Sequence, residues 1–112
     1  MTTIQTGIVY SPTISVTPST LVLVEGAHIK VVGNYFPKNI NGNIVDEYGN
    51  QVGTFTTDSN GNFKHTLKYS VTNNTGLVQV IQLFQNRNFI NIKAIWSSGQ
   101  GQGSSNTVTI FF

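Results

Sequence analysis

Apolar and polar residues alternate along most of this 112-residue chain, in short segments rich in Val, Ile, Thr and aromatic residues. Clusters of Gly and Asn separate these segments. A period of two residues is typical of strands that bury one face. We therefore predict an all-β chain with no amphipathic helix. The expected strands lie near residues 13–17, 20–25, 27–34, 42–48, 51–57, 62–70, 77–85, 89–96 and 105–112.

The alternation also assigns each side chain of a strand to a face. In FKHTLKY (63–69) the odd-numbered residues are expected to face the core. In INIKAIW (90–96) and TVTIFF (107–112) the even-numbered residues are expected to do so, which leaves Phe111 on the outside. Two sheets that each have one apolar face stack into a sandwich. We expect one β-sandwich domain over 12–112, preceded by an N-terminal arm over 1–11.

The segments between the expected strands carry turn residues. TTDSNGNF (56–63) places Asp58, Asn60 and Asn62 around a glycine, a pattern that suggests either a calcium loop or a hairpin turn. A calcium loop of the EF-hand type needs further acidic ligands and a bidentate Glu at its end, which this stretch lacks. Asp followed by Asn-Gly supplies what a tight turn needs. We predict a turn here, a second turn over 47–51, and a flexible glycine-rich loop over 97–105.

Composition removes several classes of function. Charged residues make up 9% of the chain, and the six Lys and Arg side chains are scattered. A nucleic-acid-binding protein would concentrate them on one face. The absence of cysteine excludes disulfides and Cys-ligated metals. No apolar run approaches the length of a membrane span, and we expect no signal peptide in the first residues.

Three stretches together resemble a known family. They are TPSTLVLVEGAHIKVVGNYFP, GNIVDEYGNQVGTFTTDSNGNFKHTL and the terminal SNTVTI. These stretches resemble the immunoglobulin-like repeats of bacterial and archaeal surface proteins over about 12–69 and 104–112. The resemblance implies an immunoglobulin-like sandwich of about seven to nine antiparallel strands with a structural or adhesive role, and no catalytic residues to carry over. The region 70–103 departs from the pattern.

The residues that most often carry chemistry do not form a recognisable motif. His28 and His65 both lie in expected strands, and no G-x-S-x-G elbow is present. The stretch GQGQG (99–103) lacks the G-x-G-x-x-G spacing of a phosphate-binding turn. We therefore expect no enzyme activity and no catalytic, metal or cofactor site. Asn73 heads an N-x-T sequon, so glycosylation at this position is an open alternative.

The N-terminal arm has its own alternation. Ile4, Ile8 and Tyr10 share one side of TIQTGIVY, which predicts an extension strand. Such a strand can pair within its own sheet or with the edge of a neighbour. We expect Ile4, Ile8, Tyr10 and the outward Phe111 to contact partners, which are other copies of the chain or capsid or surface proteins.

Two functional hypotheses follow. The first is a structural subunit on the exterior of an assembly, most consistent with a virion decoration, turret or minor capsid protein. An extracellular filament or surface-layer subunit is an alternative. The second is a module that binds host glycans or receptors. For the second hypothesis, exposed aromatic residues would form the binding face, and the candidates are Tyr35, Tyr48 and Phe89.

Overall fold

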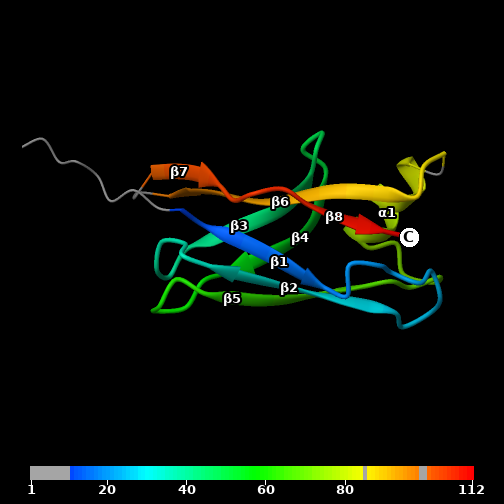
Figure 1. The fold of residues 1–112 in the computed structure, drawn as a ribbon, viewed down its shortest axis with the longest axis horizontal. Coiled ribbons are helices and arrows are strands. Elements are labelled where there is room, and N and C mark those ends of the chain that lie inside the picture. Colours follow the sequence, from blue (N-terminus) through cyan, green and yellow to red (C-terminus); the bar gives the residue numbers. More distant parts are fainter. Residues whose placement is uncertain (1–10, 85, 99–100) are drawn as a thin grey trace, which may run out of the picture.

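A computed structural model describes residues 11–84, 86–98 and 101–112. Within these residues, two antiparallel sheets pack face to face as a β-sandwich, as predicted (Figure 1). The arm residues Ile4, Ile8 and Tyr10 lie outside the described part. The first sheet has the order β1 (Thr13–Thr17), β2 (His28–Asn34), β5 (Phe63–Lys68). The second has the order β4 (Gln51–Thr56), β3 (Asn41–Asp46), β6 (Phe89–Ser98), and β6 then pairs with both β7 (Gly101–Ser104) and β8 (Val108–Phe111).

This strand order is that of an immunoglobulin-like sandwich. Named by chain order, β1, β2 and β5 take the places of strands A, B and E. The second sheet contains C (β3), C′ (β4), F (β6) and a final strand G that is divided into β7 and β8. In the described part of the chain, the helix α1 (Gly76–Leu83) lies between E and F. The predicted all-β sandwich is therefore confirmed and is consistent with the immunoglobulin-like fold that the resemblance implied, while the predicted N-terminal extension strand lies outside the described residues.

Seven of the nine predicted strands occur close to their expected positions. Their faces also agree with the alternation. On β5, Phe63 and Leu67 are buried whereas Lys64 and Lys68 are exposed. On β6, the even-numbered residues from 90 to 96 are all buried. Alternation was reliable here because a shift of one residue would move the whole apolar row of a strand into solvent.

The strand predicted at 77–85 is wrong, because this segment is the helix α1. Leu77, Val80 and Ile81 face the core at the i, i+3, i+4 spacing of a helix. The side chain of Thr75 accepts a hydrogen bond from the Val78 N–H at 3.4 Å and begins the helix as its N-cap. The run of Val and Ile fits both periods, and here tertiary packing decided for the helix.

Two further predictions fail at the ends of the sandwich. The segment 20–25 is not a strand, since only Thr20 forms a bridge, which is parallel and pairs with Phe111. The glycine-rich segment 97–105 is not simply a loop, because β6 continues to Ser98 and β7 returns beside it. The ring of Trp96 occupies the space that a side chain at position 103 would need, so glycine at this position of the edge strand β7 leaves room for the ring.

The core is organised around aromatic rings that cover glycines. Phe55 and Phe63 stack with ring centroids 4.3 Å apart, and Phe36 meets the Phe63 ring edge-on at 5.3 Å. Gly33 is the register partner of Phe63, and the ring occupies the space beside it. Gly42 is likewise the register partner of Phe55, whose ring occupies the space beside it. Glycine on the inner face therefore makes room for large rings on the neighbouring strands.

Both long sides of the sandwich are closed by segments outside the regular ladders. On one side α1 packs against β4, so closely that Gly76 adjoins the backbone of Gln51. On the other side, Asn106 projects from the break between β7 and β8 toward β1. Its side chain accepts from the Ile14 N–H at 2.7 Å and donates to the Ile14 carbonyl at 3.2 Å. This amide thereby takes the place of a neighbouring strand at that point of the β1 edge.

Candidate functional site

The structure brings some of the predicted site residues together and separates others. Tyr35 and Tyr48 are both 69% exposed, but Tyr35 precedes β3 and Tyr48 follows it. The six residues of β3 therefore separate these two tyrosines, about 20 Å along a strand. Phe89 and Phe111 are register partners on β6 and β8. Tyr35, Tyr48 and Phe89 thus do not form one aromatic platform.

Arg87 organises a cluster of aromatic residues next to Tyr48. Its guanidinium lies 4.0 Å from the ring centre of Phe84 and 4.5 Å from that of Phe89. The ring of Tyr48 stacks on the ring of Phe84, with the ring centroids 5.6 Å apart. Arg87 also forms an ion pair with Glu47, in the same hairpin as Tyr48. Each cation–π contact or ion pair at a partly exposed site contributes only modestly to the free energy of folding. Together, these contacts connect the β3–β4 hairpin to the start of β6.

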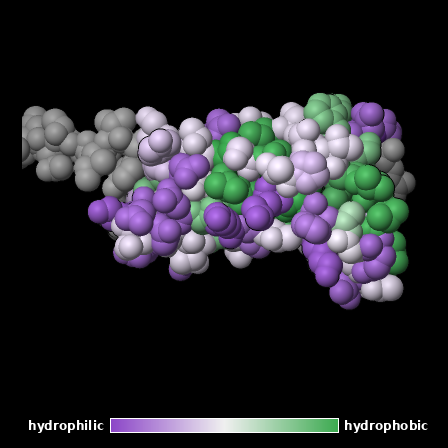
Figure 2. Space-filling view, turned by 60° about the horizontal axis from the view of Figure 1, so that its bottom comes forward, coloured by the Kyte–Doolittle hydropathy of each residue, from purple (hydrophilic) through white to green (hydrophobic). Residues whose placement is uncertain are grey.

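A larger apolar surface lies at the end of the sandwich that carries α1 and the C-terminus. Val71 is 66% exposed, Val22 and Leu83 are each 63% exposed, and Phe111 is 48% exposed. Figure 2 shows green, apolar residues gathered at this end, which is on the right in Figures 1 and 2. We call this surface the apolar end and define it by its exposed members, which are Val22, Leu23, Val24, Val71, Leu83 and Phe111.

A hollow of about 520 Å³ shares Leu23 with the apolar end. Leu23, Tyr69, Ile81 and Phe112 supply its apolar lining, and Arg87 links it to the aromatic cluster. The loop 22–26 is held over this region by Glu25, whose carboxylate accepts from the Val71 N–H at 2.7 Å and from the Ser70 hydroxyl at 3.2 Å. Single exposed apolar residues are common on protein surfaces. Several exposed apolar residues gathered at one end of a small domain are instead typical of an interaction surface.

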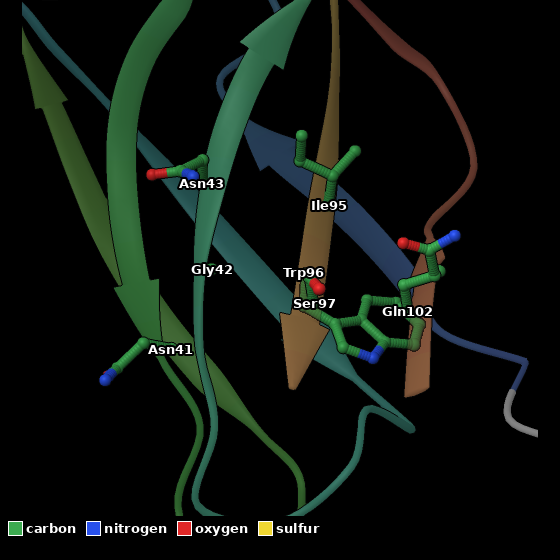
Figure 3. A pocket seen from close by; sticks show the side chains of 8 residues that line it. Asn41, Gly42, Asn43, Ile95, Trp96, Ser97 and Gln102 are labelled. Atoms are coloured by element: carbon green, nitrogen blue, oxygen red, sulfur yellow. The ribbon is translucent and has the colours of Figure 1, made fainter. Parts of the chain in front are cut away.

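A second hollow, of about 570 Å³, lies over β3, β6 and β7 near the opposite end (Figure 3). Its polar side chains are uncharged, namely Asn41, Asn43, Ser97 and Gln102. Trp96 extends from β6 toward β7 beneath them (Figure 3). This hollow offers amide and hydroxyl groups, and its lining contains no charged side chain.

The stretch that resembled a calcium loop is a turn between β4 and β5. One carboxylate oxygen of Asp58 accepts the N–H groups of Asn60 and Asn62 at 2.8 and 2.9 Å. These hydrogen bonds lower the pKa of Asp58, because they favour its charged form. Gly61 has φ +77° and lies against the carbonyl of Phe36, where a Cβ atom has no room. The carboxylate therefore serves the turn itself.

Titratable groups are sparse elsewhere in the described residues. No three His, Cys, Asp or Glu side chains there come close enough to hold a metal ion. His28 is exposed and His65 is half-buried on β5, where burial lowers its pKa. Asn73 is exposed in the loop before α1, and the Thr75 hydroxyl of its sequon is the helix cap. Across residues 11–84, 86–98 and 101–112, no helix is long and apolar enough to cross a membrane.

Comparison with known proteins adds no identity to this geometry. No protein-family model matches the sequence, and no curated protein matches it.

The alternation of apolar and polar residues does not predict the apolar end. Residues 20–25 read as a strand that would bury alternate side chains, whereas Val22, Leu23 and Val24 are all exposed. Leu83 belongs to the segment predicted as another strand, but it is the last residue of α1 and its side chain is exposed. Phe111 was the only member of this surface that alternation placed outside, and it is exposed as expected.

Proposed function

We propose that this protein is a non-enzymatic structural subunit of an assembly exposed to the exterior, where copies or neighbours join through the apolar end. A decoration, turret or minor capsid protein of a virion is the setting that we favour. An extracellular filament or surface layer would place the same demands on the chain. The observation that carries the proposal is the group of exposed Val, Leu and Phe side chains at one end of the sandwich.

The composition of the rest of the surface supports this role. Few charged residues are available to keep copies apart, since Lys, Arg, Asp and Glu make up only 9% of the chain. Each 100 Å² of apolar surface removed from water contributes about 2.5 kcal/mol. Covering the apolar end with a neighbour therefore favours association, and the low charge of the chain adds little repulsion against it.

Sedimentation velocity over the micromolar to millimolar range tests the proposal. We expect concentration-dependent association of the full chain, and substantially weaker association for Leu83→Asp and Val71→Asp, which place a charge on the apolar end. Thr66→Asp is the matched control, because Thr66 is exposed on the outer face of β5 and should leave association unchanged. A wild-type chain that stays monomeric over the whole range would refute a self-associating subunit.

A glycan- or receptor-binding module is the alternative, and one observation favours it. Tyr48 presents an exposed ring that is held in place by Phe84 beside Arg87. Stacking on sugar rings commonly uses such a fixed aromatic side chain. On a glycan array, binding that is lost in Tyr48→Ala and kept in Tyr35→Ala would support this module. Tyr35 serves as the control because it is equally exposed but lies at the other end of β3.

A further inference from the structure

We propose that residues 1–10 of one copy dock on the apolar end of a second copy as an added β-strand, so that copies join head to tail. This inference rests on the proposed function and names the partner of the apolar end. It makes the subunit contact heterologous, with a different surface on each side.

The apolar end offers an open backbone edge to such a strand. The Leu21 N–H donates to the Phe111 carbonyl at 2.7 Å, and the Phe111 N–H donates to Ser19 at 2.8 Å. The segment 19–21 is therefore the outermost row of the second sheet, beyond β8. Just after this row the chain turns, with the Val24 N–H donating to the Val22 carbonyl at 2.8 Å, and the N–H groups of Val22 and Leu23 make no hydrogen bond within the described part of the chain. The outer side of the row 19–21 is thus an open edge, and such edges are templates for β-augmentation.

The hollow next to this edge fits side chains of the arm. Its apolar lining comes from Leu23, Tyr69, Ile81 and Phe112. The arm sequence MTTIQTGIVY contains no charged side chain, and its alternate residues Ile4, Ile8 and Tyr10 are apolar. Paired as a strand, the arm would direct this row to one face, so the row can enter the hollow while the backbone pairs with the edge.

The direction of the chain favours a neighbour over the arm's own domain. β1 begins at the end opposite the apolar end and runs toward it (Figure 1). Followed backward from Thr13, the chain therefore leads away from its own apolar end. Ser11 precedes Pro12, which restricts Ser11 to extended conformations and disfavours an immediate reversal. In a head-to-tail row of copies, the same direction leads to the apolar end of the next copy.

Two variants that each remove one side of the contact provide the test. Ile4→Asp/Ile8→Asp charges the arm, and Leu23→Asp charges the apolar end. We expect each variant alone to be monomeric in sedimentation velocity where the wild type associates. Thr3→Asp/Gln5→Asp is the matched control, since it adds the same two charges to the arm outside the apolar row, and it should associate like the wild type. Unchanged Trp96 fluorescence verifies the fold of every variant.

Mixing the two monomeric variants then decides between a neighbour and the same chain. The Leu23→Asp copy keeps an intact arm, and the arm variant keeps an intact apolar end. A head-to-tail contact predicts a one-to-one dimer and nothing longer, because each pair has only one intact contact. A mixture that remains monomeric overturns the inference, since an arm docked on its own domain gives that result.

Other outcomes separate this inference from the proposed function. If the arm variant associates as strongly as the wild type while Leu23→Asp does not, copies meet end to end through the apolar end. That result overturns docking of the arm and leaves the structural subunit intact. If the wild type itself is monomeric, both proposals fail.

Discussion

Replacement of Gly33 by Ala tests whether aromatic rings over glycines hold the two sheets together. An ideal Cβ atom at this position would stand 2.8 Å from Cζ of Phe63, and two further ring atoms are closer still. Ordinary carbon contacts lie at about 3.5–4.0 Å. The ring therefore has to move by about 1 Å or more to admit the methyl group.

The neighbours of Phe63 make that movement costly. Its ring stacks on Phe55 at 4.3 Å and meets Phe36 at 5.3 Å, and only 5% of Phe63 is exposed. Overpacking of a closed core costs about 1–3 kcal/mol, and two adjoining rings place this site in the upper part of that range. Loss of glycine freedom from the unfolded chain offsets about 0.4–1 kcal/mol. We expect a net loss of about 2 kcal/mol in the free energy of unfolding.

Urea unfolding followed by the fluorescence of Trp96, the single tryptophan, measures this loss. A loss of about 2 kcal/mol lowers the urea midpoint by roughly 1 M, and the melting temperature by about 8 °C for a domain of this length. In a Phe63→Leu background the added methyl group has more room. There we expect Gly33→Ala to cost less than about 0.5 kcal/mol, which gives a coupling of more than 1 kcal/mol.

Gly49→Ala is the control. Gly49 has φ +85° in the β3–β4 turn, with no atom near an added Cβ. Its replacement should cost about 1 kcal/mol through the backbone alone, equally with Phe63 or Leu at position 63. A neutral Gly33→Ala would refute the packing argument, and so would a cost that is identical in both backgrounds.

Two further predictions concern polar groups. Asp46 is buried, and its carboxylate accepts hydrogen bonds from the Tyr48 N–H, the Asn50 N–H and the Asn50 side chain at 2.9, 2.7 and 2.8 Å. Asp46→Ala should therefore lower the free energy of unfolding in urea by about 2–3 kcal/mol, and Asp46→Asn by less than half of that, because Asn keeps an oxygen for both backbone N–H groups. Equal losses in the two variants would contradict this role of Asp46. Burial lowers the pKa of His65 below 6.5, so as the pH falls below 6.5 the unfolded chain binds a proton before the folded one does and stability decreases. His65→Gln should reduce the dependence of the urea midpoint on pH between 5 and 7.5, and an unchanged dependence would show that His65 does not contribute.

The parts of the fold that the sequence predicts well are those where one physical cause dominates. β5 and β6 alternate strictly, because each has one face on the core and one toward solvent. The turn at Asp58 follows from local chemistry, since its hydrogen bonds span only four residues. Such features depend on few distant contacts and can be inferred without knowing the rest of the structure.

The helix α1 could have been found from the same residues. Leu77, Val80, Ile81 and Phe84 stand at the i, i+3, i+4, i+7 spacing, and Thr75 is a common capping residue. The same segment contains Val-Gln-Val, which also reads as a strand, and β-branched residues favour that interpretation. The contact of Gly76 with the backbone of β4 favours the helix, and the local sequence does not predict a contact between such distant segments.

The segment 20–25 poses a different problem, because here local preference and the structure of one chain disagree. Leu21, Val22, Leu23 and Val24 have strong strand preference, yet only the start of the segment pairs with β8. Natural sequences usually agree with their folds at each level, so a conflict of this kind points to a missing interaction. A strand added by a neighbouring arm would supply both the backbone partners and the apolar contacts that Val22 and Leu23 lack. The strand predicted at 20–25 fails for a single copy; if the proposed docking of the arm occurs, we expect the segment that follows Thr20 to gain backbone partners only in the assembled protein.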